Sequence, residues 1–156
     1  MDAYGNGGMA ALIAVFGAMM FVFVIIGIIL YVLMALGLSK LASNKGIENP
    51  WLAWIPVANL YIVARIIGTL SIGSWNVPSL ELFLPGSALA VIIFSWIHVI
   101  GQLLTIGFAV LWFFALYKLY KMYRPSQATL WLVLSIILSF MAPIFIYIMR
   151  NDSPAA

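Results

Sequence analysis

The sequence predicts an all-α integral membrane protein, a four-helix transmembrane bundle with the N-terminus and C-terminus both extracellular. Hydrophobic residues make up 66% of the chain and charged residues only 7%, whereas soluble globular domains carry about 25% charged residues. The charged residues also lie near the ends of long apolar runs. So few charged side chains cannot cover the apolar surface in water, so lipid must be part of the solvent. We expect a single transmembrane domain over residues 1–156.

The first crossing is expected over residues 9–38, which contain no charged residue. At about 1.5 Å per residue, this run is longer than a hydrocarbon core of about 30 Å, so it must tilt or protrude. No basic segment precedes it, and it is about twice as long as the core of a signal peptide, which favours an uncleaved helix. Ala10, Ala14 and Ala18 recur every four residues and would admit another helix closely, unless they simply face lipid.

The second crossing is expected over residues 51–68. Asn49 suits a helix N-cap, and Pro50 suits the first helical position. The segment is close to the minimum length for crossing and contains Pro56 and Arg65. An interfacial or re-entrant placement is therefore the alternative.

The distribution of charge favours a crossing at this segment. Lys and Arg gather on the cytoplasmic side of membrane proteins. If residues 51–68 cross, five basic residues share one side, whereas without this crossing the basic residues divide three against three. The cytoplasmic side would hold Lys40, Lys45, Lys118, Lys121 and Arg124, and the outer side Asp2, Glu81, Arg150 and Asp152.

Arg65 falls in the last turn of the second crossing, where its side chain would reach the outer headgroups. A buried ion pair or a contact to a substrate anion is the alternative, and an exposed pair with Glu81 would contribute at most about 1 kcal/mol. Pro56 is expected to kink the helix, and Asn59 to bond to the freed backbone or to a neighbouring helix. The motif of this segment comprises Trp51, Pro56, Asn59, Tyr61 and Arg65.

Uncharged polar residues follow one face of the third crossing, which is expected over residues 88–117 and continues as a helix to Lys121. Ser87 is expected to cap it, after a loop over residues 71–86 that lies along the outer interface. Positions i, i+3, i+7 and i+10 lie on one narrow helix face. The residues at these positions form the polar seam, which comprises Ser95, His98, Gln102 and Thr105.

Three roles are compatible with the polar seam, because polar side chains at mid-membrane depth normally face protein or water. The seam could pack against another helix, line a path for a solute or ion, or present His98 as a pH-responsive or catalytic group. A metal site needs three or four ligands, and His98 is the only histidine in a chain without cysteine. Catalysis lacks an orienting acid beside Ser95 and His98. We therefore expect no catalytic residue, no metal and no cofactor.

Tyrosines and basic residues alternate at the end of the third crossing. This pattern is typical of an anchor in the cytoplasmic headgroups, with an attraction to anionic lipid of about 1 kcal/mol per basic residue. The basic residues lie at the ends of apolar runs, which is not the pattern of a patch for nucleic acid. The predicted headgroup residues are Tyr117, Lys118, Tyr120, Lys121, Tyr123 and Arg124.

The fourth crossing is expected over residues 128–149, after a proline has ended the third helix. Ser135 and Ser139 lie one turn apart and predict a small-residue face that another helix can approach. Pro143 is expected to kink this helix. Arg150 would then close it at the outer surface.

Two stretches of the chain resemble a known group of proteins. The strings GIENPWLAWIPVANLYIVARIIG and YRPSQATLWLVLSIILSFMAPIFIYIMRN are similar to segments of small, uncharacterised multi-spanning membrane proteins of Gram-positive bacteria. The resemblance covers residues 35–70 and 115–151. The resemblance implies a multi-pass protein of the bacterial cell membrane with a four-span or similar fold, and it implies no activity. The W-x-x-x-I-P-x-x-N-x-Y core of that group falls on Trp51, Ile55, Pro56, Asn59 and Tyr61.

Two functions follow from these observations. The first is a non-enzymatic membrane subunit or accessory protein, which associates with itself or with another membrane protein through small and polar helix faces. The second is a small oligomeric channel or transporter, with a path lined by the polar seam. Four short spans seldom enclose a path alone, so this second function requires an oligomer. In both cases the lipid bilayer surrounds the protein and no nucleic acid is bound.

Overall fold

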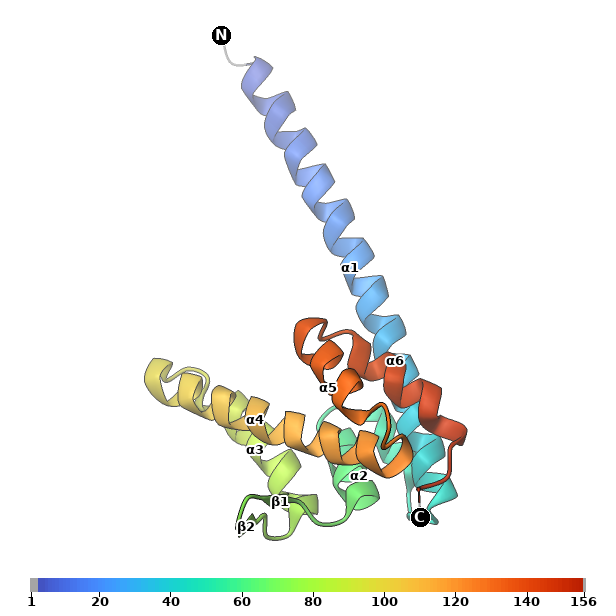
Figure 1. Ribbon diagram of the computed structural model, residues 1–156. Coiled ribbons are helices and arrows are strands. Elements are labelled where there is room, and N and C mark those ends of the chain that lie inside the picture. Colours follow the sequence, from blue (N-terminus) through green and yellow to red (C-terminus); the bar gives the residue numbers. More distant parts are fainter. Residues whose placement is uncertain (1–2, 156) are drawn as a thin grey trace.

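The computed structural model describes residues 3–155, which are mostly helical, as the sequence predicts (Figure 1). Two of the helices are long and apolar enough to cross a membrane, over Gly7–Asn44 and His98–Tyr123. The elements in chain order are α1 (Ala3–Asn44), η1 (Pro50–Trp54), α2 (Ala58–Ile67), β1 (Ser71–Ile72), β2 (Trp75–Asn76), α3 (Leu80–Phe94), α4 (His98–Tyr123), α5 (Ala128–Ile137), α6 (Met141–Ile148) and η2 (Met149–Asn151).

The first helix, α1, stands out from the rest of the molecule for more than half of its length (Figure 1). Its side chains are exposed from residue 7 to residue 29. Its last turns pack against η1 and α6. At this contact Gly37 is buried, and a β-carbon placed there would lie 2.8 Å from the backbone oxygen of Ile146. The lack of a side chain at Gly37 therefore lets α1 and α6 approach closely.

Residues 50–67 form a hairpin of two short helices, so the continuous helix expected over residues 51–68 is wrong. Pro56 has no amide hydrogen to extend η1, and it disfavours a helical conformation in the residue before it. Ile55 is accordingly extended, and Val57 has a positive φ of 70°. The predicted kink is thus a reversal of the chain, after which α2 begins.

The tip and the end of this hairpin lie at different heights along α1. At its tip, the carbonyl of Trp54 accepts a 2.8 Å hydrogen bond from the hydroxyl of Tyr31 on α1. At its end, the carbonyl of Ile66 accepts a 2.5 Å hydrogen bond from Lys45 Nζ. Tyr31 lies about 21 Å along α1 from Lys45, at about 1.5 Å per residue. The segment therefore rises along α1 and returns to the level at which it started.

The loop expected over residues 71–86 is largely ordered into regular elements. The two short strands β1 and β2 pair antiparallel, and α3 begins at Leu80. Ser87 therefore lies inside α3, where its hydroxyl donates a 2.7 Å hydrogen bond to the carbonyl of Leu84. The prediction of Ser87 as a helix cap is wrong.

A second hairpin is formed by α3 and α4, where one unbroken helix is expected. The chain turns at residues 95–97, and α4 then packs back against α3. Gly101 permits this return, because a β-carbon there would lie 3.0 Å from the backbone oxygen of Phe94. The prediction of one helix from residue 88 to Lys121 is therefore corrected to two helices.

A third hairpin, α5 and α6, replaces the single helix expected over residues 128–149. The chain turns at residues 138–140. Pro143 lies in the first turn of α6, where a missing amide hydrogen breaks no helical hydrogen bond, so it begins a helix instead of kinking one. Ser139 lies in the turn and shares no helix face with Ser135, which contradicts the predicted small-residue face.

The core lies where the three hairpins meet the last turns of α1. Tyr120 of α4 is fully buried. Its ring lies edge-on to Trp131 at 5.6 Å and to Phe145 at 6.1 Å, and these two rings stack at 4.4 Å. The Ser135 hydroxyl donates to the carbonyl of Trp131 at 2.8 Å, so Tyr120 donates to Ser135 Oγ at 3.0 Å.

The charged side chains of residues 3–155 gather at one end of the molecule, which we term the charged end. Ion pairs join Arg65 to Glu81 at 3.2 Å and Arg124 to Asp152 at 2.6 Å. Lys118 Nζ donates to the hydroxyl of Thr69 at 3.3 Å. These contacts bring together the ends of α2 and α4, the start of α3 and the C-terminal tail. The charged end comprises Lys40, Lys45, Glu48, Arg65, Glu81, Lys118, Lys121, Arg124, Arg150 and Asp152.

These contacts contradict the predicted division of charge between two sides of a membrane. The predicted division places Arg124 and Asp152 on opposite sides, yet these two residues form an ion pair. The Asn44 side chain also donates to the carbonyl of Arg150 at 3.2 Å, which brings the predicted inner and outer surfaces into contact. Each hairpin begins and ends at the charged end. Asp2, the remaining charged residue, lies outside the described residues.

Candidate functional site

The polar seam lies at the tip of the α3–α4 hairpin. Ser95 follows the last residue of α3, His98 begins α4, and Gln102 and Thr105 lie one and two turns further along. All four side chains line one groove of about 420 Å³, together with Gly101 and Ile106. The four residues therefore lie together although the expected helix is broken between Ser95 and His98. His98, Gln102 and Thr105 remain on one helix, and Ser95 lies beside them in the turn.

The hydrogen bonds within the seam divide its residues into two kinds. The hydroxyl of Ser95 donates to the carbonyl of Ile92 at 2.8 Å, and that of Thr105 donates to the carbonyl of Gly101 at 2.7 Å. These hydroxyls are satisfied within their own helices. Within residues 3–155, no side-chain hydrogen bond is formed by His98 or Gln102. The imidazole and the amide are therefore open to a partner.

Large apolar side chains surround the seam and are exposed. Trp96 at the tip is 88% exposed, which is more than any other large hydrophobic residue of the described chain. The hairpin tip thus presents a polar groove within an exposed apolar surface. The exposed apolar neighbours are Ile92, Ile93, Phe94, Trp96, Ile97, Val99, Ile100, Leu103 and Ile106.

The second-helix motif does not form one site. Trp51 is exposed on η1, Pro56 lies in the turn, and Asn59 is buried in the first turn of α2. Tyr61 and Arg65 share a face of α2, with the guanidinium carbon 5.8 Å from the ring centre. Arg65 also forms the ion pair that the sequence suggested with Glu81, at 3.2 Å with both side chains about 40% exposed.

The predicted headgroup residues divide between surface and core. Tyr120 and Tyr123 are buried in the protein, which contradicts their prediction as headgroup residues. Each step of three residues turns about 60° around a helix, so Tyr117 stays at the surface while the other two tyrosines turn inward. Lys121 is exposed, and its Nζ lies 6.0 Å from the centre of the Tyr117 ring.

Arg124 lies just beyond α4 and holds the C-terminal tail. Its guanidinium donates to both carboxylate oxygens of Asp152 and lies 5.4 Å from the centre of the Trp131 ring. The hydrogen bond that Arg124 donates to Asp152 raises the pKa of Arg124 above its ordinary value. The arginine therefore stays charged, and the tail also bonds through the amide of Ala155 to the carbonyl of Met122 at 2.7 Å.

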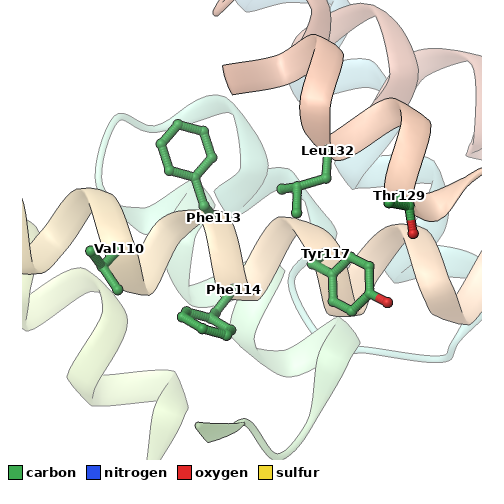
Figure 2. A pocket seen from close by; sticks show the side chains of 6 residues that line it. All are labelled: Val110, Phe113, Phe114, Tyr117, Thr129 and Leu132. Carbon is green, nitrogen blue, oxygen red and sulfur yellow. The ribbon is translucent and has the colours of Figure 1, made fainter. Parts of the chain in front are cut away.

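An apolar groove between α4 and α5 was not predicted (Figure 2). It measures about 480 Å³ and is lined mainly by apolar and aromatic side chains. Four of its residues follow the i, i+3, i+4, i+7 spacing of one helix face. That signal is in the sequence, but the groove also depends on where α5 lies. We term it the acyl groove, and it is lined by Val110, Phe113, Phe114, Tyr117, Thr129 and Leu132.

Comparison with protein-family models, with curated proteins and with solved structures found no match to the chain. Within the described residues, no three His, Cys, Asp or Glu side chains lie close enough to hold a metal ion.

Proposed function

We propose that this protein is a non-enzymatic subunit of the bacterial cell membrane that associates with a second copy of itself through the polar seam. The observation that carries this proposal is the unsatisfied pair His98 and Gln102, at a hairpin tip whose other side chains are apolar and exposed. In lipid these two side chains find no water to replace a missing hydrogen bond. A protein partner satisfies them at the same depth.

A second copy suits the chemistry of this pair. A neutral imidazole carries one donor and one acceptor, and a glutamine amide carries two donors and an acceptor. Two seams related by a two-fold axis can therefore pair His98 of one copy with Gln102 of the other, in both directions.

Self-association is measurable by energy transfer between labelled copies in vesicles. The chain has no cysteine, so Ser153→Cys in the tail provides a single labelling position. The double variant His98→Phe, Gln102→Leu should weaken association about 3- to 30-fold. This range corresponds to the about 0.6–2 kcal/mol that hydrogen bonds between membrane helices contribute. Gln127→Leu is the control, since Gln127 lies in the turn before α5 and is not part of the polar seam. Unchanged association of the double variant would refute the proposal.

The alternative function is a small oligomeric channel or transporter, and the polar lining of the 420 Å³ groove favours considering it. In that case the double variant should keep its association and lose ion or solute flux across the same vesicles. If the wild type and the double variant associate equally well and neither conducts, the seam serves neither function.

We further propose that α1 crosses the bilayer and that the three hairpins enter it from the cytoplasmic side. The charged end supports this arrangement, because it holds seven basic and three acidic residues, a net charge of +4, and positive charge stays on the cytoplasmic side. The sequence-based alternative is four crossings with both termini extracellular. The ion pair between Arg124 and Asp152 favours the re-entrant arrangement.

Single cysteines distinguish the two arrangements. Cysteine is placed at Asn44, Asn76, Ser126 or Ser153, and intact cells are treated with a membrane-impermeant thiol reagent. The re-entrant arrangement predicts that all four positions are protected and become reactive when the cells are opened. Four crossings predict labelling of Asn76 and Ser153 from outside, with Asn44 and Ser126 protected.

A further inference from the structure

The acyl groove changes in polarity along its length. Figure 2 shows Phe113 and Phe114 on either side of α4, with Leu132 of α5 above the helix. The two hydroxyl-bearing residues of the groove, Tyr117 and Thr129, lie at the end nearest the close of α4 (Figure 2). A ligand that fills this groove is therefore apolar over most of its length and polar at one end.

The polar end of the groove is also the positively charged one. Lys121 lies one turn beyond Tyr117 and places its Nζ 6.0 Å from the centre of that ring. Lys118 follows Tyr117 in the sequence and belongs, like Lys121, to the charged end. An anionic group is favoured here by charge and by hydroxyl donors together.

We propose that the acyl groove holds one chain of an anionic phospholipid, with the phosphate against Lys121 and the hydroxyls of Tyr117 and Thr129. A volume of 480 Å³ falls within the range of about 300–1,000 Å³ for small-molecule sites. The groove is open along α4, one of the two helices long and apolar enough to cross a membrane, so a lipid chain reaches it from the bilayer. This proposal rests on the membrane location proposed above.

Lipid retention tests the proposal directly. The purified full chain is equilibrated with mixed micelles of phosphatidylcholine and phosphatidylglycerol, and retained lipid is counted by native mass spectrometry. The wild-type protein should retain phosphatidylglycerol in preference to phosphatidylcholine. Lys121→Gln should reduce phosphatidylglycerol retention about fivefold, as expected for one basic residue near a lipid surface, and leave phosphatidylcholine unchanged.

A second variant tests the apolar part of the groove. Val110 is about half exposed, so tryptophan is accommodated there without disturbing the core, and circular dichroism checks that the helices are intact. Val110→Trp should lower retention of both lipids about tenfold or more, which corresponds to displacing about two methylene groups. Lys40→Gln, on α1, is the matched charge control and should retain lipid as the wild type does.

Three results would overturn the proposal. The first is normal lipid retention by Val110→Trp. The second is equal retention of phosphatidylglycerol by Lys121→Gln and Lys40→Gln. The third is weaker self-association of Val110→Trp with unchanged lipid retention, which would indicate a protein occupant. The His98→Phe, Gln102→Leu variant should retain lipid normally, so failure of the seam leaves this site intact. Flotation of the protein with vesicles tests the membrane location separately.

Discussion

Replacing Gly37 with alanine tests the closest contact between α1 and α6. The new β-carbon would lie 2.8 Å from the backbone oxygen of Ile146, 2.9 Å from its carbonyl carbon and 2.9 Å from its Cγ2. Carbon atoms normally pack about 3.5–4.0 Å apart. Two of the three atoms belong to the backbone, so rotation of a side chain cannot relieve the contact. The helix α6 itself must move away from α1.

The expected effect combines a steric cost with a helical gain. Overpacking of a core costs about 1–3 kcal/mol, whereas alanine in place of glycine inside a helix gains up to about 1 kcal/mol. Gly37→Ala should therefore lower the free energy of unfolding by about 0–2 kcal/mol. Gly27→Ala is the matched control, because a β-carbon at Gly27 of the same helix meets no atom within 4 Å. The difference between the two variants, about 1–3 kcal/mol, isolates the contact with α6.

The free energy of unfolding is measured in mixed micelles titrated with a denaturing detergent, with helix content followed by circular dichroism. If the unfolding transition of Gly37→Ala involves a smaller loss of helix than that of the wild type, the substitution has separated α6 locally from α1. If Gly37→Ala proves as stable as Gly27→Ala, α6 does not lie against α1 at this position. The description of the third hairpin would then be wrong.

Two further substitutions test the core and the C-terminal tail. Tyr120→Phe removes the hydrogen bond to Ser135 and should lower the free energy of unfolding by about 0.5–1.5 kcal/mol. The control Tyr147→Phe should change this free energy by less than about 0.5 kcal/mol. Equal effects of the two substitutions would contradict the role of the Tyr120 hydroxyl. Asp152→Asn breaks the pair with Arg124, whose side chains are about one-third exposed, and should cost less than about 1 kcal/mol, diminishing in high salt. Because this pair raises the pKa of Arg124, the arginine's contribution is complete below its ordinary pKa and is lost only as the pH rises through the raised value. The difference between wild type and Asp152→Asn should thus stay constant from neutral to mildly alkaline pH, and a decline there would count against the assignment.

Local chemistry was predictable from the sequence where neighbouring residues decide it. Pro56 marks the interruption between η1 and α2, because the missing amide hydrogen acts on the chain beside it. The polar seam was predicted from spacing alone, and its four residues line one groove. The sequence offered an exposed pair between Arg65 and Glu81 as a possibility, beside the favoured contact of Arg65 with headgroups, and the structure contains this pair at 3.2 Å.

The direction in which each segment returns was not predictable in the same way. Residues 51–68 are long enough to cross, and the prediction assumed that each apolar run changes sides. The hydrogen bonds that hold the hairpin, from Tyr31 to Trp54 and from Lys45 to Ile66, join residues more than twenty positions apart and leave no local pattern. Tyr120 was assigned to the headgroups for a similar reason, since the Trp131 and Phe145 rings that bury it belong to later helices.

The gathering of charge at one end also bears on how the chain enters a membrane during synthesis. The turns at residues 55–57, 95–97 and 138–140 contain no charged side chain. In the re-entrant arrangement these turns enter the bilayer first and the charged residues stay at the charged end. No ionised group of a hairpin then has to be carried through hydrocarbon, which costs about 2.5–3.5 kcal/mol per Lys, Arg or Asp on insertion scales. Each hairpin can then insert as a closed unit from the side on which it is made, after α1 is in place.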